Sequence, residues 1–570
     1  MKYRWEINES PAERVNEFRD AGRVTRLTAL ALARLGLEPA SVAAHLNPML
    51  SRLSDPYELA GTKVAAERIW QAVQNQERIL VYGDYDTDGI TATVLMCEVL
   101  AENGALVDCY LPHRIDDGYG LTADSLQRVC TGEQRLLVTV DCGITCNEAI
   151  ASANVRGMDV IVSDHHEPRE KIPPALAVID PKLRGSPEHF RGLAGVGVAF
   201  KLCHAFVKYG RQHGLGGHDT DLREYLDLVA LGTVADIVPL LDENRCLVTS
   251  GLDILSRQHR PGIRALCDIA NLRDDVRTTD ITFRLAPRIN AAGRMGNPDE
   301  AFQLLHARDT TEAYHVAASL DERNRERQQI EARVLAEAEE QIHGLPDLAA
   351  RRTLLVCGEE WHQGVIGIVA SRLVRKYNRP SIVLTRDPNG QLCGSGRSVE
   401  EINLVTLLAE CEFCLSRFGG HAMAAGLAMA PERMEEFGVA FEQVVGRVLG
   451  EVPDVPALRV CGRVDLAELS DQVFEEMEQL EPFGHSNPEP VFASLGVEPE
   501  RVLPAGKSHS RGTVIGPAGQ RFGFIYFGVP PANLPPAPWD IAFTPQWNRY
   551  NGSVQPQLKI VDVRSSQAGA

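Results

Sequence analysis

Residues 78–89 read RILVYGDYDTDG, a short apolar run that is followed by three closely spaced aspartates. The run contains β-branched residues and ends in glycine and acids, which is typical of a strand buried on both faces of a parallel sheet. RLLVTVDCG (135–143) and MDVIVSDHH (158–166) repeat the pattern, and helix-like stretches at 89–100 and 147–154 separate the runs. The sequence therefore predicts strand–helix–strand units that build a parallel α/β sheet.

Acidic and imidazole side chains follow each apolar run: Asp84, Asp86 and Asp88, then Asp141, then His165 and His166. Ligands of open α/β sheets bind beyond the carboxyl ends of the strands, so we expect these groups to meet. Carboxylates and imidazoles suit Mn²⁺ and Mg²⁺, and six such groups exceed what one ion usually takes from a protein. The sequence thus predicts a site for two divalent ions, Mn²⁺ or Mg²⁺. The alternative, that the acids are helix caps and turn residues, would account for one cluster more easily than for three.

A further acid lies inside the apolar stretch DLVALGTVADIVPL (227–240). A carboxylate in such a stretch is costly to bury unless it is paired or binds a metal. We therefore predict that Asp236 is a metal ligand. Asp227, nine residues earlier, is interpreted as an acid on a helix surface.

The order of these four motifs resembles the DHH phosphoesterase superfamily, which includes manganese-dependent inorganic pyrophosphatases and phosphodiesterases of small oligonucleotides. Later segments resemble its RecJ branch, the single-strand-specific DNA exonucleases: PRINAAGRMGNP (287–298), WHQGVIGIVASRL (361–373), GSGRS (394–398) and GGHAMAAG (419–426). The resemblance runs from near the N-terminus to the last strand-like segment. It implies a 5′-to-3′ exonuclease on single-stranded DNA that releases 5′-mononucleotides in recombination and repair.

Two-metal chemistry assigns a role to each predicted ligand. Asp141 would bridge the ions, Asp84 and Asp86 would hold one of them, and Asp88, His165 and Asp236 would hold the other. Two neighbouring ions lower the pKa of a shared water and stabilise the attacking and leaving oxygens of an in-line displacement at phosphorus. We expect Asp164 to orient His165 by a hydrogen bond and His166 to face the scissile phosphate as a donor or acid. Related phosphatases place a histidine near the position of Asp84.

Residues of the later motifs are predicted to bind substrate. Gly419, Gly420 and His421 allow a close approach of the backbone, and the helix-like MAAGLAM (423–429) follows them, so amides and an imidazole would hold a phosphate. This segment resembles the DHHA1 domain, whose GGH motif holds substrate across the cleft. The neighbouring GSGRS adds Ser395 and Arg397.

Four basic residues that precede these motifs in the sequence complete the predicted substrate site. The guanidinium groups of Arg288 and Arg294 suit bidentate phosphate contact, and interdomain ion pairs are the alternative. His113 and Arg114, in LPHRIDDGYG (111–120), follow another strand-like segment and are assigned to substrate as well.

At 570 residues the chain is too long for one compact core. We predict an N-terminal helical segment (1–48), a parallel-sheet DHH catalytic domain (49–310), a connecting helix (311–345), a smaller α/β DHHA1 substrate-binding domain (346–450) and a β-barrel OB-fold domain that binds single strands (455–570). The connecting helix is predicted because residues 311–343 contain no Gly or Pro and are polar nearly all round.

The net charge of −19 would repel a phosphate backbone, but the charge is unevenly distributed. Residues 501–570 carry seven Lys and Arg against two acids. The same stretch holds eight aromatics, namely Phe522, Phe524, Tyr526, Phe527, Trp539, Phe543, Trp547 and Tyr550. Basic groups interleaved with aromatics indicate single-strand binding by an OB-fold. About half of the aromatics are expected in the barrel core.

The thirteen cysteines are scattered, and no apolar run approaches membrane-spanning length, so we expect a cytoplasmic protein. Single-stranded DNA is the predicted partner, and the resemblance implies cooperation with a helicase and with single-strand-binding protein. The alternatives are a phosphodiesterase on short oligonucleotides or cyclic dinucleotides, a pyrophosphatase, and a non-catalytic replication or repair scaffold. A basic, aromatic C-terminal domain argues against a small substrate, and a full set of mutually repelling ligands argues against a scaffold.

Overall fold

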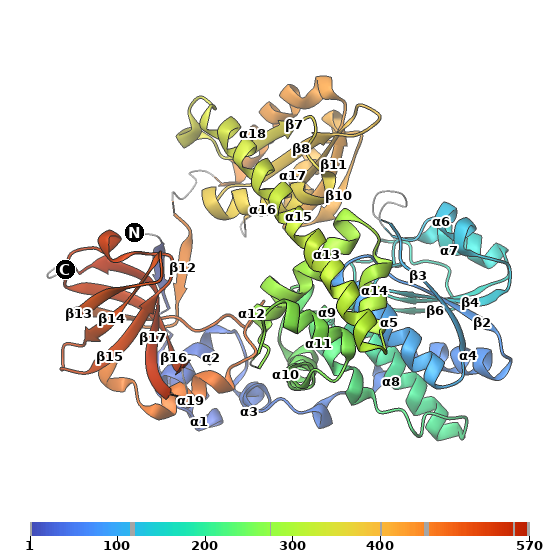
Figure 1. Cartoon of the computed structure of the whole chain (residues 1–570), viewed down its shortest axis with the longest axis horizontal. Coiled ribbons are helices and arrows are strands. Elements are labelled where there is room, and N and C mark those ends of the chain that lie inside the picture. The colour runs from blue at the N-terminus through green and yellow to red at the C-terminus, as the bar shows by residue number, and fades with distance from the viewer. Residues whose placement is uncertain are drawn as a thin grey trace. The chain divides into compact units, whose positions relative to one another are not determined.

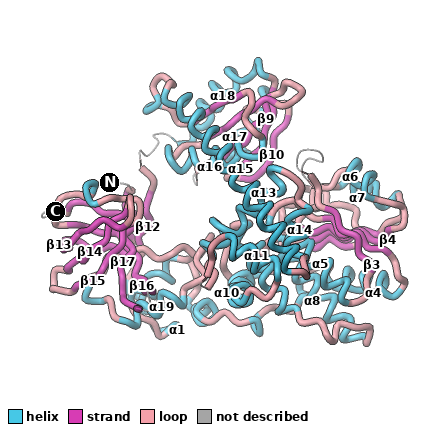
Figure 2. Tube along the Cα trace, viewed as in Figure 1, coloured by secondary structure: helices cyan, strands magenta, loops and turns pink. Residues whose placement is uncertain are grey.

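The computed structural model of the chain describes residues 3–8, 10–113, 120–273, 275–399, 402–449, 455–550 and 553–566. The chain divides into two compact units, one formed by Trp5–Leu320 with Leu458–Ala570 and the other by Asp321–Ala457. Figure 1 labels the helices and strands, and Figure 2 distinguishes them by colour. Each unit has its own sheets and its own hydrophobic cores.

All predicted metal ligands except Asp236 follow strands of a five-stranded parallel sheet in the order β3-β2-β4-β5-β6. The strands are β2 (Arg78–Tyr82), β3 (Leu106–Tyr110), β4 (Gln134–Val140), β5 (Asp159–Ser163) and β6 (Ala177–Ile179). The three strands predicted from the runs that end in acids, β2, β4 and β5, are neighbours. Because all five strands run the same way, their carboxyl ends lie at one edge of the sheet.

Helices cover both faces of this sheet, which explains why its inner strands β2, β4 and β5 are largely apolar. Ile79 and Val81 of β2 pack in a large core with α4 (Thr62–Gln74), α5 (Thr87–Glu102), α8 (Gly195–His213) and α9 (Leu226–Ala235). Leu80 and Tyr82 pack on the opposite face with α6 (Ala123–Val129) and α7 (Asn147–Val155). The predicted doubly covered parallel sheet is confirmed.

The large core extends beyond the sheet. Its further helices are α10 (Asp242–Arg257), α11 (Pro261–Ile269), α13 (Ala286–Met295) and α14 (Asp299–His306). The short α12 (Thr278–Asp280) and a π-helical turn, η6 (Ile281–Leu285), precede α13. The 34-residue helix α15 (Thr310–His343) follows and confirms the predicted connecting helix. Its first part buries Ala313, Ala317 and Leu320 in this core, and its last part buries Val334, Ala338 and Ile342 in a core of the second unit.

The second unit contains a mixed sheet in the order β10-β11-β9-β8-β7. The strands are β7 (Leu354–Gly358), β8 (Ser381–Arg386), β9 (Leu392–Arg397), β10 (Arg417–His421) and β11 (Ala424–Met429). Helix α16 (Gln363–Tyr377) shares one core with the end of α15, and α17 (Leu404–Glu410) and α18 (Met434–Leu449) share another.

The expectation that residues 423–429 are helical is wrong. Ala424–Met429 form β11, which pairs with β10 on one side and with β9 on the other. Alanine and methionine favour helices, but hydrogen bonding to two neighbouring strands outweighs this weak local preference.

The C-terminal residues form a closed barrel in the order β13-β14-β15-β17-β16. Its strands are β13 (Phe492–Ala505), β14 (His509–Ile515), β15 (Arg521–Tyr526), β16 (Trp539–Tyr550) and β17 (Ser553–Ser565), and β12 (Ala457–Val460) and α19 (Asp471–Gln479) precede them. β15 and β17 are parallel and the other neighbours antiparallel, as in a five-stranded OB-fold. Four of the predicted aromatics are buried in the barrel: Phe524, Tyr526, Trp539 and Phe543.

The N-terminal segment packs against this barrel. It consists of β1 (Arg4–Ile7), α1 (Ala12–Gly22), α2 (Arg26–Arg34) and α3 (Val42–Leu46), and β1 pairs with β12. Phe18 and Leu27 share a core with barrel residues such as Phe492, although more than 400 residues separate them in sequence. This long-range packing, and the strand β1, were not predicted from the sequence.

No single helix among the described residues is long and apolar enough to cross a membrane. One sharply bent pair, Arg26–Arg34 with Pro39–Leu46, reaches the required length and composition when both helices are taken together.

Candidate metal centre

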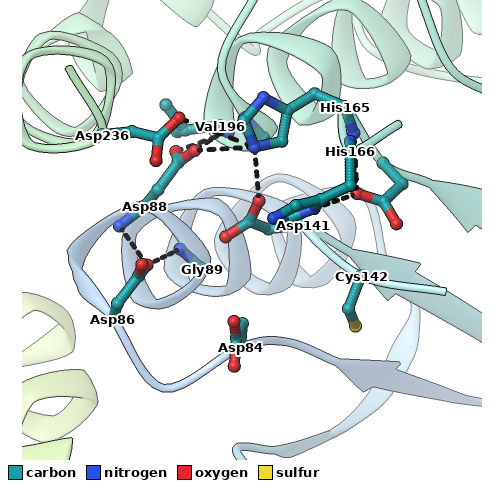
Figure 3. Close-up of polar contacts among 12 residues, drawn as sticks. Asp84, Asp86, Asp88, Gly89, Asp141, Cys142, His165, His166, Val196 and Asp236 are labelled. Carbon is teal, nitrogen blue, oxygen red and sulfur yellow. Dashed lines mark hydrogen bonds and ion pairs between the residues drawn. The ribbon is translucent and has the colours of Figure 1, made fainter. Parts of the chain in front are cut away.

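Seven side chains from the predicted motifs converge at the carboxyl ends of β2, β4 and β5 (Figure 3). They are Asp84, Asp86, Asp88, Asp141, His165, His166 and Asp236. The Nε2 atom of His165 lies 3.2 Å from Asp141 Oδ1, 3.6 Å from Asp236 Oδ2 and 3.9 Å from Asp88 Oδ2. The fold therefore brings four separate motifs to one place.

The candidate ligand atoms form three groups within which all atoms lie within 4.8 Å of one another. The groups are Asp84 with Asp86 and Asp141, Asp88 with His165 and Asp236, and Asp141 with His165 and His166. The first two share no residue and have the composition that the sequence predicts for two ions. The assignment of each side chain to an ion stays a prediction.

The turn between β2 and α5 holds the first three acids. Asp86 caps α5, because its Oδ1 accepts hydrogen bonds from the backbone N–H groups of Asp88 at 2.9 Å and Gly89 at 3.1 Å. Asp84 Oδ1 accepts one from Tyr85 N at 2.8 Å. The alternative interpretation as a helix cap thus holds for Asp86, but it does not explain the other acids that surround it.

Asp88 is held by the N-terminus of α8. The N–H groups of Gly195 and Val196 donate to its two oxygens at 2.7 and 2.8 Å. A Cβ atom at Gly195 would lie 2.3 Å from Asp141 Oδ1, so only glycine fits here. These two residues were missed, although the glycine-rich GLAGVGVAF (192–200) is a sequence signal for such a close approach.

Asp141 adopts a left-handed backbone conformation, with φ of 61°. Aspartate is one of the few residues that tolerate this conformation. Its N–H donates to Ser163 O at 2.9 Å, while its buried Oδ1 accepts no hydrogen bond from any described residue. A buried carboxylate oxygen that receives no hydrogen bond is the arrangement expected of a metal ligand.

Asp236 ends α9, and a quarter of its side chain is exposed. The interpretation of Asp227 as a surface acid is wrong, because Asp227 is buried and its Oδ2 accepts a hydrogen bond from Arg260 Nε at 3.1 Å. Because α9 is apolar and buried on all sides, Asp227 has no route to solvent, and the buried carboxylate is paired with Arg260 instead.

Asp164 holds His166 rather than His165. Its Oδ1 lies 2.8 Å from His166 Nδ1 and also accepts the backbone N–H of His165 at 2.7 Å. Its Oδ2 accepts Ile144 N at 2.9 Å. The expectation that Asp164 orients the ring of His165 is therefore wrong, since the residue order along the strand end gives no information on ring direction.

The pKa values of the cluster reflect uncompensated negative charge. Burial, followed by the charge of Asp86, raises the pKa of both Asp84 and Asp88 to about 7. Burial and Asp88 raise the pKa of Asp236 to about 9, and burial and the same neighbouring acids raise that of Asp141 well above its usual range. Divalent cations would remove this repulsion and keep all four acids ionised.

The two histidines are shifted in opposite directions. Burial lowers the pKa of His165 to about 3, which keeps its imidazole neutral, the form that binds metals. Burial also opposes the charging of His166, but the hydrogen bond to Asp164 and the charge of Asp164 prevail and raise its pKa to about 9.

Asp180 is a further acid at this edge of the sheet that was missed. It follows β6, its Oδ1 accepts the N–H of Lys182 at 2.7 Å, and its buried Oδ2 has no partner among the described residues. Burial raises its pKa to about 7. The signal was present, because an apolar run also precedes this acid in ALAVID (175–180).

Helix α13, which carries Arg288 and Arg294, contacts the first motif. Asn290 of this helix accepts hydrogen bonds at Oδ1 from the backbone N–H and the hydroxyl of Thr87, at 2.8 and 2.9 Å. The Nη1 of Arg288 donates to Arg284 O at 2.5 Å. Asn290 and Thr87 were not predicted, and the phosphate role of the two arginines stays a prediction.

In the second unit, the predicted substrate residues share one face of the sheet. Ser395 and Gly419 are both register partners of Gly426, and Arg397 and His421 are both register partners of Ala424. Alternate residues of a strand share a face, so all four lie on the same side.

This face offers room for a ligand around Gly419, whereas Gly367 of α16 packs against Ser395 and Arg397. Arg397 Nη1 donates to Ser395 Oγ at 2.8 Å, and no atom lies within 4 Å of a Cβ placed on Gly419. Gly420, with φ of +145°, has a conformation that other residues rarely adopt. In the first unit, His113 follows β3, whereas Arg114 lies outside the described residues.

Three family profiles match successive parts of the chain. The DHH family N-terminal domain matches residues 78–233, the DHHA1 domain matches residues 351–447, and the RecJ OB domain matches residues 462–562.

The chain is also similar to proteins named single-stranded-DNA-specific exonuclease RecJ. The Bacillus subtilis protein is 36% identical over 99% of this chain and 71% of its own length. The Dickeya dadantii protein is 38% identical over 78% of this chain and 80% of its own. The Thermus thermophilus protein is 33% identical over 92% of this chain and 73% of its own.

Solved structures agree with the sequence similarity. The crystal structure of RecJ from Thermus thermophilus in complex with Mn²⁺ has a TM-score of 0.82 at 31% identity, covering 100% of this chain and 80% of that one. The complex of the same protein with Mg²⁺ has a TM-score of 0.77 at 29% identity, covering 100% and 79%. Three domain profiles match this chain, and 99% of it aligns with the Bacillus subtilis exonuclease at 36% identity. The chain therefore belongs to the RecJ family of single-stranded-DNA-specific exonucleases.

Proposed function

We propose that this protein is a metal-dependent exonuclease that degrades single-stranded DNA from the 5′ end and releases 5′-mononucleotides in recombination and repair. The observation that carries the proposal is the pair of ligand groups, Asp84–Asp86–Asp141 and Asp88–His165–Asp236, which share no residue. Family membership supports the DNA substrate, and the polarity and the role in repair are inferred from the family resemblance.

The donor atoms fit two divalent ions. Five carboxylates and one neutral imidazole are hard or borderline ligands, and Asp141 Oδ1 is buried without a hydrogen-bond donor. One relative, RecJ from Thermus thermophilus, was crystallised with Mn²⁺ and with Mg²⁺. Bound ions would polarise a water and neutralise charge on the reacting phosphate.

The chain's own residues would orient the strand and manage the proton. Asp164 holds the ring of His166 by Nδ1 and favours its charged form, so that an imidazolium lies beside Asp141 and His165. Such a cation would attract the scissile phosphate and donate a proton to the departing oxygen. We therefore assign catalysis to His166 and positioning to Asp164. The metal ligands are Asp84, Asp86, Asp88, Asp141, His165 and Asp236.

Phosphate recognition is proposed for two further groups. Arg288 and Arg294 lie on α13, which contacts the metal-binding turn through Asn290. In the second unit, the residues proposed to bind a phosphate or sugar lie where the sheet is uncovered around Gly419: Ser395, Arg397, Gly419, Gly420 and His421. His113 and Arg114 complete the proposed substrate contacts.

We propose that the barrel binds the part of the DNA strand that is distant from the cleaved bond. The cations available for this binding are fewer than the seven that residues 501–570 contain. Four of its seven cations pair with acids: Arg521 with Glu500, Arg549 with Glu478, Lys559 with Glu489, and Arg564 with Asp540. Arg501, Lys507 and Arg511 are exposed and make no ion pair among the described residues.

These three cations lie on or beside the hairpin of β13 and β14, close to an exposed aromatic. Phe527 is 54% exposed, and its ring lies edge-on to His509 at 5.3 Å between centroids. We name Arg501, Lys507, Arg511 and Phe527 the hairpin patch. Cations that follow the backbone and an aromatic that stacks on a base are what sequence-independent binding of single strands requires.

The domain boundaries predicted from the sequence, a cytoplasmic location, and cooperation with a helicase and single-strand-binding protein belong to the same proposal. All thirteen cysteines are free thiols, which supports a reducing compartment. The family resemblance alone supports the two protein partners.

One experiment tests the proposal. Purified protein is offered single strands labelled at the 5′ or the 3′ end, duplex DNA, RNA and a cyclic dinucleotide, each with Mn²⁺, Mg²⁺ or a chelator. We expect metal-dependent release of 5′-mononucleotides from the 5′ end of single-stranded DNA. Preferred cleavage of the cyclic dinucleotide, or cleavage that persists in the chelator, would contradict the proposal.

A further inference from the structure

Ile237 has an unusual backbone conformation for its side chain. It follows Asp236, has φ of 59°, and its side chain is 63% exposed. Among the described residues it is the only β-branched residue with a positive φ. β-Branched residues in the left-handed region are genuine outliers, because Cβ and its two substituents crowd the backbone.

The fold requires the left-handed conformation at this position but not the isoleucine. Helix α9 ends here, with Asp236 N donating to Gly232 O at 3.0 Å and Ile237 N to Val234 O at 3.4 Å. Helices commonly end in one left-handed residue, usually glycine or asparagine. Gly214 after α8 and Asn378 after α16 follow that rule. Arg23 after α1 and Gln258 after α10 depart from it, but neither is β-branched.

Core packing does not explain the isoleucine either. Most of its side chain is exposed to solvent, whereas Leu231 and Val234 of the same helix are buried. An exposed apolar group in a strained conformation costs stability, and such costs persist where the residue serves a function.

The position of Ile237 indicates what that function is. Asp236 points its carboxylate into the cluster, with Oδ2 3.6 Å from His165 Nε2 (Figure 3). Neighbouring Cα atoms are about 3.8 Å apart, so Ile237 stands at the rim of the candidate metal centre. The acids around it would hold cations, so an apolar contact is the interaction that Ile237 could add.

We propose that Ile237 contacts the nucleobase next to the phosphodiester bond that is cleaved. This inference rests on the proposed function. Its side chain packs against the face of the base and so holds the terminal nucleotide over the acids. An aliphatic contact distinguishes poorly among bases, since all four present an apolar face, and it suits degradation without sequence preference.

The test uses Ile237→Asn and a matched control, Val155→Asn. Val155 is also β-branched, stands at the C-terminal end of α7 and is 89% exposed. Because α7 runs back from the end of β4, Val155 lies away from the edge that carries the acids. We expect Ile237→Asn to lower kcat/KM on single strands by about tenfold, a factor comparable to the loss of one base contact. Its Tm should stay equal or rise, because asparagine tolerates the left-handed conformation. Val155→Asn should leave kcat/KM unchanged.

A second measurement compares normal single strands with strands in which the terminal nucleotide lacks its base. The base is removed either at the end that the enzyme attacks or at the opposite end. The wild type should degrade the strand with the abasic attacked end about tenfold more slowly, whereas Ile237→Asn should degrade it no more slowly than a normal strand. The inference would be overturned if Ile237→Asn kept the kcat/KM of the wild type, or if the missing base slowed both proteins equally. It would also be overturned if Ile237→Asn and Ile237→Gly both had a lower Tm than the wild type. A wild type that does not degrade single strands would instead refute the proposed function.

Discussion

The two ends of helix α5 carry buried acids whose charges are neutralised in different ways. Near the C-terminal end, Glu98 contacts Arg260 Nη1 at 3.0 Å, His306 Nδ1 at 3.0 Å and Arg308 Nη2 at 3.3 Å. At the N-terminal end, Asp88 lies among other acids and a histidine that burial keeps neutral.

The pKa values separate the two ends. Burial tends to raise the pKa of Glu98, but the hydrogen bond from His306 and the charge of Arg260 hold it below its ordinary value. The pKa of Asp88 is raised to about 7 by burial and by Asp86. The Glu98 end supplies its own cations and is structural, whereas the Asp88 end leaves negative charge that an external cation would neutralise.

The largest expected effect is at Asp141. Replacing it by asparagine keeps the left-handed backbone but removes the shared charge, and we expect cleavage of single strands to fall about a thousandfold or more. Affinity for a long single strand, measured with a labelled strand in the absence of metal, should change little. Retained cleavage would remove Asp141 from the proposed mechanism.

At the other end of α5, loss of a cation should destabilise the fold. Arg260→Met leaves Glu98 and Asp227 without their shared partner, and breaking such a buried pair costs about 3–5 kcal/mol. Denaturant unfolding measures the loss. Arg223→Met is the matched control, because Arg223 pairs with Asp221 on the surface and should change stability little. Equal effects of the two variants would contradict the structural role of the Glu98 end.

The stability of the metal-free protein should depend on pH. Asp84 and Asp88 have folded pKa values of about 7 and Asp236 of about 9, all above the ordinary 3.8, so the folded state binds more protons than the unfolded state between these values. Stability should therefore fall as pH rises from about 4 to 9. Mn²⁺ competes with protons, so the rise in Tm on adding it should be larger at pH 8 than at pH 5. A metal-induced rise that is the same at both pH values would count against ionised ligands.

The smallest effect concerns the hairpin patch. Lys507→Ala and Arg511→Ala should each weaken binding to long single strands several-fold and flatten its salt dependence, because each phosphate contact releases condensed counterion. Cleavage of very short strands should be unchanged. Arg549→Ala serves as the control, since Glu478 already neutralises that cation. An equal loss in all three variants would move the strand-binding surface away from the hairpin.

Local sequence patterns predicted the elements whose packing is also local. The apolar runs of β2, β4 and β5 and the long helix α15 carry their own signals, and so do the acids that end the runs. The order of the motifs then gave the family. The convergence of Asp84, Asp141 and His165 follows from one rule about parallel strands.

Features set by distant partners could not be predicted. Asp227 is buried because Arg260, 33 residues away, reaches it. Residues 424–429 form a strand because two other strands flank them. Asp88 depends on amides at Gly195 and Val196, and the direction of the His166 ring depends on Asp164, none of which a local pattern specifies.

The central claim is that the cluster of acids at the N-terminal end of α5 binds divalent cations. Counting the Mn²⁺ ions that the purified protein binds, by titration calorimetry, tests it most directly. We predict two ions per chain in the wild type, a reduced count in Asp88→Ala, and weaker binding of both ions in Asp141→Asn. Failure of the wild type to bind Mn²⁺ saturably, or an unchanged count and affinity in both variants, would contradict the claim.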